Sequence, residues 1–194
     1  MRYVVAGAAG FIGSHLCDRL LEQGHEVVGV DSLVTGSRSN LDGALTHTNF
    51  SFIEHDIRSQ LHVDGAVDRV LNLASPASPI DFDRIPVHIL ETGSIGTQHL
   101  LDLALAKNAR FFLASTSEAY GDPEVHPQPE TYLGNVSSTG PRSCYDEAKR
   151  FAEAITMAYH RAYGLDVRIA RIFNTYGERM RPDDGRVEIG RAHV

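Results

Sequence analysis

The sequence predicts an α/β protein built on a doubly wound parallel sheet with helices on both faces. Short apolar runs rich in Val alternate with amphipathic stretches of helical periodicity, the order expected of a parallel sheet. A glycine-rich turn follows the first apolar run, and an aspartate ends the second. The length of 194 residues suits one domain, or a large domain and a fragment of a second, and the 42% hydrophobic content is ordinary for a globular protein.

The expected strands and helices follow from apolar runs and from the glycines that end them. The helix after the first turn has apolar residues at positions 12, 16, 20 and 21, and Gly24 ends it. The stretch 122–141 is too long for a simple connection, and such loops are usually functional. Strands are expected at 2–7, 25–31, 50–56, 68–74, 109–115 and 165–174, and helices at 11–23, 86–107 and 142–163.

The composition argues against several classes of protein. The net charge of −7 disfavours general nucleic-acid binding, and no apolar run is long enough to cross a bilayer. The first residues are typical of a strand and turn rather than of a signal peptide. Cys17 and Cys144 lie far apart and the ten His are scattered, so no metal site is expected. These features favour a protein of the reducing cytoplasm.

The first turn, GAAGFIG, spaces Gly7, Gly10 and Gly13 as GxxGxxG. Glycines there let the backbone approach a pyrophosphate at the N-terminus of the next helix, which begins with Phe11 and Ile12. A glycine triplet alone is a weak signal, and the alternative is an ordinary glycine-rich turn. Its place between a strand and a helix favours a Rossmann-type dinucleotide site.

Asp31 ends the second expected strand, where an acid accepts hydrogen bonds from the adenosine ribose of NAD. This position favours NAD over NADP, although Arg38 lies close enough in sequence to argue for NADP. Asp56 and Ile57, at the end of the third strand, are expected to contact adenine, with a surface aspartate as an equal alternative. Ala74, at the end of the fourth strand, completes the expected cofactor site.

The segment YDEAK places Tyr145 and Lys149 four residues apart, on one face of a helix. A nearby ammonium favours the phenolate and lowers the pKa of the tyrosine, which can then take a proton from a sugar hydroxyl. The alternative is an ordinary amphipathic pair, since YxxxK often occurs by chance. The dinucleotide turn upstream favours a catalytic pair.

The strand at 109–115 runs into a polar segment that presents Thr116, Ser117 and Glu118 in a row. Polar turns after strands are common, and such a turn is the alternative here. With a cofactor turn and a YxxxK pair in the same chain, this strand end becomes a candidate catalytic segment.

Together, the GxxGxxG turn, the STSE strand end and the YxxxK pair resemble the extended short-chain dehydrogenase/reductase family, whose members act on nucleotide sugars. The resemblance covers residues 1–187 and is strongest for the UDP-glucuronate decarboxylase branch. Five longer matches carry it: NLASPASP (72–79), ASTSEAYGDP (114–123), HPQPE (126–130), GPRSCYDEAKR (140–150) and RIFNTYG (171–177).

The resemblance implies roles for the strand end. Thr116 would bind the sugar O4 that Tyr145 deprotonates, while Ser117 and Glu118 would position the ring and handle protons. The related 4,6-dehydratases carry Asp-Glu at the last two positions, and a serine hydroxyl cannot replace the acid that protonates a leaving hydroxide. The implied reaction is NAD-dependent decarboxylation of UDP-glucuronate to UDP-xylose through a transient 4-keto sugar.

Substrate contacts elsewhere are implied in the same way. Asn174 matches a residue that holds the nucleotide-sugar phosphates, with capping of the strand-end turn as the alternative. Pro76, Ser78 and Arg181 are the other residues expected to bind the UDP-sugar. The full-length relatives generally form homodimers through the two long helices.

Two positions depart from the family pattern. Phe82 stands where Tyr is usual, which removes a hydroxyl contact, and Glu178 replaces a Pro, which loosens that turn. Cys144 is expected to be a packed small residue rather than a redox group.

A dTDP-glucose 4,6-dehydratase or a nucleotide-sugar epimerase is the alternative enzyme. A non-catalytic NAD-binding module is the alternative from another class.

The match to the family ends at 187, and the chain then reads EIGRAHV. Apart from its first bases, a common sequencing-library adapter would encode these residues, so 188–194 is expected to be a non-native tail on a truncated gene. A genuine divergent tail is the alternative. The expected domain is then an NAD-binding Rossmann domain at 1–187, without the substrate-binding C-terminal part of the family and its catalytic arginine. Such a fragment is expected to bind NAD with little or no turnover.

Overall fold

The computed structural model describes residues 1–185 and confirms the predicted parallel sheet. The strands lie in the order β3-β2-β1-β4-β5-β6, and every neighbouring pair is parallel. The tail predicted at 188–194 lies outside the described residues. The strands are β1 (Arg2–Ala6), β2 (Glu26–Asp31), β3 (Phe50–Glu54), β4 (Arg69–Asn72), β5 (Arg110–Thr116) and β6 (Val167–Ile172).

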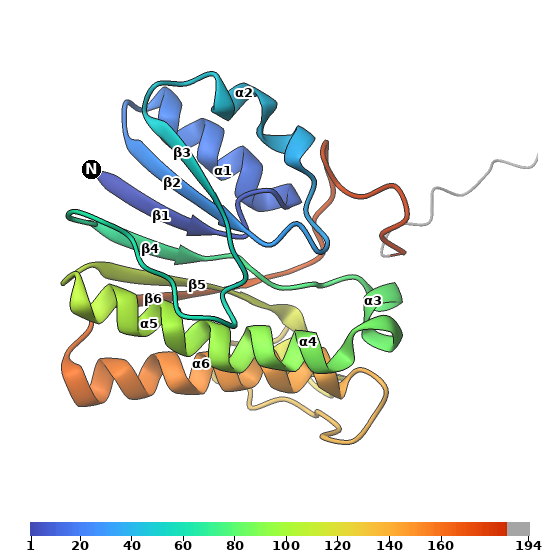
Figure 1. The fold of residues 1–194 in the computed structure, drawn as a ribbon. Helices are drawn as coiled ribbons and strands as arrows, with labels where there is room; N and C mark the ends of the chain where they lie inside the picture. Colours follow the sequence, from blue (N-terminus) through green and yellow to red (C-terminus); the bar gives the residue numbers. More distant parts are fainter. Residues whose placement is uncertain (186–194) are drawn as a thin grey trace, which may run out of the picture.

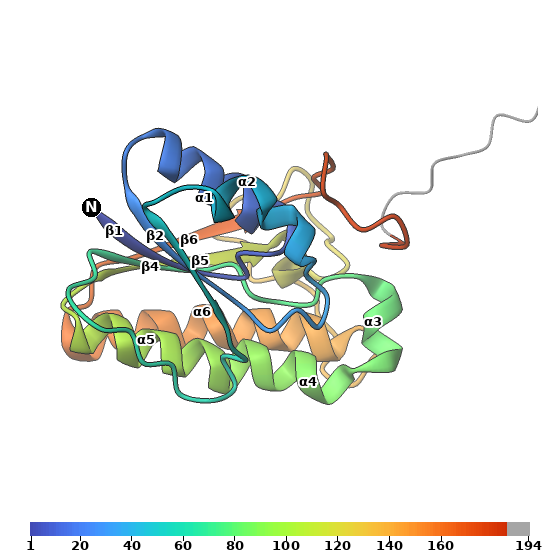
Figure 2. The same cartoon turned by 45° about the horizontal axis from the view of Figure 1, so that its top comes forward.

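Helices lie on both faces of the sheet, as Figures 1 and 2 show. An apolar cluster lies under each layer of helices, with Val5 and Leu21 on one face and Leu100 and Phe111 on the other. Because both faces are covered, the central strands are continuous apolar runs rather than alternating ones. The helices are α1 (Phe11–Glu22) and α2 (Asp42–Leu45) on one face, and α4 (Pro86–Glu91), α5 (Thr97–Ala106) and α6 (Ser143–Tyr163) on the other.

The direction of chain progression reverses beside β1. From there β2 and β3 extend toward one edge, and β4, β5 and β6 toward the other. At such a switch point the loops that follow the two central strands diverge and leave a crevice at the carboxyl ends of the strands. In this chain, the turn after β1 meets the segment after β4 there, so that Gly7 lies against Leu73.

Several elements differ from the sequence prediction. β3, β4 and β6 end earlier than predicted, so Asp56, Ile57, Ala74 and Asn174 lie in the segments that follow these strands rather than at their ends. Helical periodicity cannot be recognised in segments of four to six residues, which explains why the following short elements were not predicted. They are α2, α3 (Pro79–Arg84), and the 3₁₀ turns η1 (Arg38–Leu41) and η3 (Ser117–Tyr120).

The helix predicted at 86–107 is interrupted by a π-helical turn, η2 (Thr92–Gly96). Two glycines allow close packing there. A Cβ on Gly93 would lie 2.6 Å from the Cβ of Ala148 on α6, and one on Gly96 would lie 2.8 Å from the side chain of Ile57. Real side chains do not approach so closely, so the packing of this segment against α6 and against Ile57 requires glycine.

We therefore expect Gly93→Ala to destabilise the fold by about 1–3 kcal/mol, because the added methyl forces η2 and α6 apart. Urea unfolding measures the change. Gly43→Ala in α2 is the matched control, since its nearest neighbour, Oδ1 of Asp18, lies 3.9 Å away. The control should be neutral or stabilising by up to about 1 kcal/mol, as for alanine in a helix. Equal effects of the two substitutions would contradict the packing argument.

Candidate active site

The turn between β1 and α1 requires glycine at two positions. Gly7 has φ +82°, and a Cβ there would lie 2.7 Å from the backbone of Leu73. A Cβ on Gly13 would lie 1.9 Å from the carbonyl oxygen of Gly7. Gly10 precedes α1 without a side-chain cap, and the first turn of α1 holds no acid. The N-terminus of α1 is therefore open to an anion.

Three cavities meet at this turn. They have volumes of about 410, 70 and 280 Å³, and Gly10 and Ser75 line all three. The cavities thus adjoin one another along the carboxyl edge of the sheet. The hydroxyl of Ser75 is buried and has no hydrogen-bond partner among residues 1–185. Sequence analysis did not single out Ser75, because an isolated serine after a strand carries no signal of its own.

The structure brings most of the predicted residues to these cavities. The 410 Å³ cavity, here called the main cleft, is lined by Gly7, Gly10, Phe11, Ile12, Gly13, Thr116, Ser117, Glu118, Tyr145, Lys149 and Asn174. The 70 Å³ cavity is lined by Gly7, Gly10, Asp31, Asp56, Ile57, Ala74 and Pro76. Ser78 and Arg181 line only the 280 Å³ cavity, apart from the other predicted substrate residues.

Asp31 is the last residue of β2, as predicted, and its carboxylate is held by backbone amides. Its Oδ2 accepts a hydrogen bond from the N–H of Ala9, and its Oδ1 accepts one from Leu33, each at 2.9 Å. Burial raises the pKa of Asp31. Arg38, the residue that argued for NADP, lies 5.3 Å from the ring of Phe52 and lines none of the three cavities.

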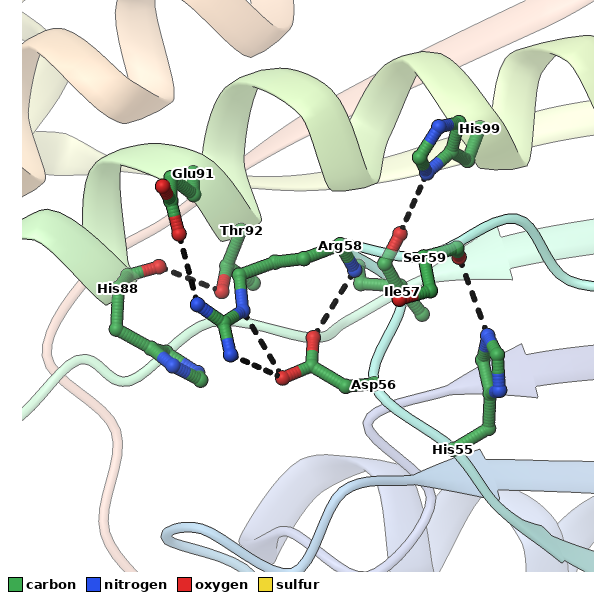
Figure 3. A network of polar contacts seen from close by, with 9 residues as sticks. All are labelled: His55, Asp56, Ile57, Arg58, Ser59, His88, Glu91, Thr92 and His99. Atoms are coloured by element: carbon green, nitrogen blue, oxygen red, sulfur yellow. Dashed lines mark hydrogen bonds and ion pairs between the residues drawn. The ribbon is translucent and has the colours of Figure 1, made fainter.

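Asp56 belongs to a polar network between the loop after β3 and helix α4, shown in Figure 3. Its Oδ2 accepts hydrogen bonds from Nε and Nη2 of Arg58 at 2.9 and 2.8 Å, and Arg58 also pairs with Glu91 at 2.7 Å. Burial works to raise the pKa of Asp56, but the bonds from Arg58 outweigh it and lower the pKa. His88 on α4 also lines this cavity, and burial lowers its pKa.

The network explains how the two predicted adenine contacts are held. The side chain of Ile57 is buried in the core, and its carbonyl oxygen lies 2.9 Å from Nδ1 of His99 on α5. Arg58 fixes the side chain of Asp56, and both Asp56 and Ile57 line the 70 Å³ cavity. Sequence analysis missed Arg58 and Glu91, which lie 33 residues apart and meet only in the folded chain.

The strand-end hydroxyls have different partners. Ser115 donates to Oε1 of Glu153 at 2.6 Å, on α6. Thr116 caps the turn η3, because its Oγ1 accepts the N–H of Glu118 at 3.2 Å. The carboxylate of Glu118 forms an ion pair with Arg142 at the start of α6. Thr116, Ser117 and Glu118 are thus fixed by one short turn at the edge of the main cleft.

Lys149 is buried beneath the main cleft, with 6% of its surface exposed. Its Nζ donates to the carbonyl of Ala114 at 2.9 Å and lies 5.9 Å from the centre of the Tyr145 ring. Burial lowers the pKa of Lys149 to about 8. The predicted pair therefore places a lysine ammonium, whose pKa is lowered by burial, beside the ring of Tyr145.

Phe82, which stands where the family usually has Tyr, packs against the predicted catalytic tyrosine. Its ring stacks on Tyr145 with centres 5.2 Å apart and planes inclined by 18°. Cys144 is buried in the same cluster, and burial raises its pKa, which agrees with the packed residue that was predicted.

Arg181 contacts Asp81 at 2.9 Å, and Ser78 donates to the carbonyl of Asp184, so both predicted substrate residues have protein partners.

The described part of the chain gives no sign of a metal centre or a membrane helix. Among residues 1–185, no group of three or more His, Cys, Asp or Glu is arranged to hold a metal ion. No helix within the same range is long and apolar enough to cross a membrane.

Residues 3–190 match the NAD dependent epimerase/dehydratase family. The chain belongs to this family. This member is 53% identical over 188 residues to UDP-glucuronic acid decarboxylase 3 of Arabidopsis thaliana, covering 96% of this chain and 54% of that protein. It is 51% identical over 186 residues to UDP-glucuronic acid decarboxylase 1 of Danio rerio, covering 96% and 44%. The chain thus spans about half the length of these relatives.

Solved structures show the same fold for this epimerase/dehydratase family member. The structure of UDP-glucose 4-epimerase from Thermotoga maritima with UDP-glucose has a TM-score of 0.82 at 34% identity, covering 94% of this chain and 59% of that one. UDP-glucuronic acid 4-epimerase from Bacillus cereus in complex with NAD has a TM-score of 0.81 at 30% identity, with the same coverage.

Replacing Lys149 with Met is expected to stabilise the fold at pH 7 by about 2 kcal/mol, because no ammonium is then buried. The folded pKa of about 8 lies below the ordinary 10.5, so the unfolded chain binds this proton more tightly. Wild-type stability should therefore rise as the pH rises from 8 toward 10.5, and the gain from the substitution should shrink.

Urea unfolding of both proteins at pH 7 and pH 10 measures this gain. Lys107→Met is the matched control, since Nζ of Lys107 also donates to a backbone carbonyl at 2.9 Å but lies at the surface. The control should show no pH-dependent gain. A gain for Lys149→Met that is the same at both pH values would exclude the buried charge as its cause.

Proposed function

We propose that this chain is the cofactor-binding part of an NAD-dependent UDP-glucuronate decarboxylase that forms UDP-xylose. The observation that carries the proposal is the joint lining of one cleft by Thr116, Ser117, Glu118, Tyr145 and Lys149, next to the glycine turn. The 53% identity to a plant UDP-glucuronic acid decarboxylase supports the same substrate.

The residues of the chain fit NAD. The uncapped N-terminus of α1 suits a pyrophosphate, and the buried, unpartnered hydroxyl of Ser75 offers a hydrogen bond at the meeting point of the cavities. Asp31 at the end of β2 suits a ribose, and Asp56 suits the amino group of adenine. When bound, NAD would accept hydride from C4 of the sugar and later return it.

The proposed proton chemistry belongs to three side chains. Oγ1 of Thr116 already accepts the N–H of Glu118, so its hydroxyl hydrogen is available for a sugar oxygen. Tyr145 would take the O4 proton, with Lys149 beneath its ring favouring the phenolate. As carbon dioxide leaves, its bonding electrons would pass into the C4 carbonyl, and the resulting enolate would take a proton at C5. The departing group itself needs no acid at position 117, which is consistent with Ser117.

Ser117 also distinguishes the alternative enzymes. A 4,6-dehydratase must protonate a leaving hydroxide, and the one carboxylate in η3, Glu118, is paired with Arg142. We therefore rank a dehydratase below the decarboxylase, and the 53% identity to a UDP-glucuronic acid decarboxylase favours that enzyme over an epimerase. A non-catalytic NAD-binding module does not explain why the tyrosine, lysine and threonine line one cleft.

We further propose that the complete protein is a cytoplasmic homodimer. Helices α4 and α6 expose Val87, Leu90 and Phe151, apolar side chains that suit a helix-to-helix interface. Cys17 and Cys144 are both free and buried, which suits a reducing compartment. Pro76, Ser78, Asn174 and Arg181 stay proposed contacts of the UDP-sugar.

The chain is expected to bind NAD at least about tenfold more tightly than NADP, because Asp31 would repel a 2′-phosphate. Titration calorimetry with each cofactor measures the ratio. Asp31→Asn, which removes the charge, should narrow the ratio, whereas Asp42→Asn at an exposed position should leave it unchanged. Equal wild-type affinity for both cofactors would contradict the role of Asp31.

Joined to the C-terminal part of the Arabidopsis relative, the chain is expected to release carbon dioxide from UDP-glucuronate and to form UDP-xylose. Tyr145→Phe should lower the rate by about 10²–10⁴, the usual contribution of a general base. Tyr163→Phe is the matched control, because Tyr163 is 61% exposed at the far end of α6. Conversion of dTDP-glucose in place of UDP-glucuronate would replace the proposal with the dehydratase.

A further inference from the structure

A largely buried carboxylate lies one helical turn beyond Lys149 on α6. Tyr145, Lys149 and Glu153 follow one another at intervals of four residues, which places them along one helix face. We propose that Glu153 is a positioning residue that keeps the buried ammonium of Lys149 charged beneath Tyr145, while Ser115 and Arg171 fix Glu153 in place. This inference rests on the proposed function of Tyr145 and Lys149.

Glu153 is fixed from two neighbouring strands. Ser115 on β5 and Arg171 on β6 are direct partners in the strand register. Ser115 donates to Oε1 of Glu153 at 2.6 Å, and Arg171 donates from Nε to Oε1 at 2.9 Å and from Nη2 to Oε2 at 2.7 Å. This two-point pairing leaves the carboxylate little freedom to turn. The side chain of Glu153 is 16% exposed.

Arg171 is held in turn by an aromatic ring. Its guanidinium carbon lies 4.6 Å from the centre of the Tyr120 ring, in the turn η3 that follows β5. The same network therefore joins the strand-end turn of the main cleft to the middle of α6.

The carboxylate of Glu153 is expected to stay charged at neutral pH. Burial raises the pKa of Glu153, but the hydrogen bonds from Arg171 and Ser115, with the charge of Arg150 on α6, bring it below its usual value. Lys149 needs such a neighbour, because burial disfavours its ammonium and the charge of Glu153 acts in the opposite direction. Without Glu153, the lysine would lose its proton at a lower pH.

A purely structural ion pair is the competing explanation. Such a pair would fix α6 to the sheet and affect the free energy of unfolding, with no effect on the proton affinity of Lys149. The two explanations differ in one measurable quantity, the pKa of Lys149. That quantity does not depend on catalysis, so it can be measured on the chain as it stands.

The sequence makes this measurement direct, because Lys107 and Lys149 are its two lysines. In a chain labelled with [13Cε]lysine, carbon NMR should give one signal for each, and Lys107→Arg assigns them. We expect Glu153→Gln to lower the pKa of Lys149 by about one unit, a tenfold loss of proton affinity, and to leave Lys107 unchanged.

Glu147→Gln is the matched control. Glu147 lies closer to Lys149 in sequence, but its side chain is 37% exposed and its ion-pair partner at 3.8 Å is Arg150. This variant should leave the pKa of Lys149 unchanged. If Glu153→Gln does not fold, the double variant Glu153→Gln/Arg171→Gln removes the whole ion pair. A smaller fall in the pKa of Lys149 is then expected, because loss of the Arg171 cation partly offsets loss of the carboxylate.

An unchanged pKa of Lys149 in a folded Glu153 variant would overturn the inference and leave a structural ion pair. A fall of equal size in Glu147→Gln would overturn it as well, because the effect would then be general to the helix. Failure of the completed enzyme to decarboxylate UDP-glucuronate would instead refute the proposed function, whatever the NMR titration shows.

Discussion

The contact between two backbones at the switch point of the sheet is the constraint on which the site depends. Gly7 lies so close to Leu73 that a Cβ would be 2.7 Å from the backbone. This contact brings the turn after β1 and the segment after β4 together, and the three cavities meet beside it at Gly10 and Ser75. A larger residue at position 7 would separate the strands and move the N-terminus of α1 away from the main cleft.

A second constraint is electrostatic. The core under the main cleft contains an ammonium and a carboxylate on one face of α6, and the fold meets the cost of burying them with strand-end partners. Lys149 donates to Ala114, and Glu153 accepts from Ser115 and Arg171. The last residues of β5 therefore hold Lys149 and Glu153 in place, so the polar strand end is more than a turn. The lysine proposed to assist Tyr145 is therefore also expected to lower the stability of the fold, because burial disfavours its charged form.

The sequence was sufficient for the features that depend on local pattern. Val-rich runs predict strands that are covered on both faces. Local motifs identify Gly7, Asp31, Tyr145 and Lys149 as candidate site residues, and the fold brings them to the adjoining cavities. The sequence was not sufficient for contacts between residues that are far apart in the chain and meet only in the folded structure. The link from Arg58 to Glu91 and the alignment of Ser115 with Arg171 join residues far apart in the chain. Short helices and the π-helical turn also escaped prediction, because packing rather than periodicity determines them.

A crystal structure of the chain with NAD tests the central claim, that the three adjoining cavities form one cofactor and substrate site. The account predicts a pyrophosphate at the first turn of α1, an adenosine between Asp31 and Asp56, and a nicotinamide ring in the main cleft beside Tyr145. NAD bound away from the glycine turn, or with its nicotinamide outside the main cleft, would contradict it.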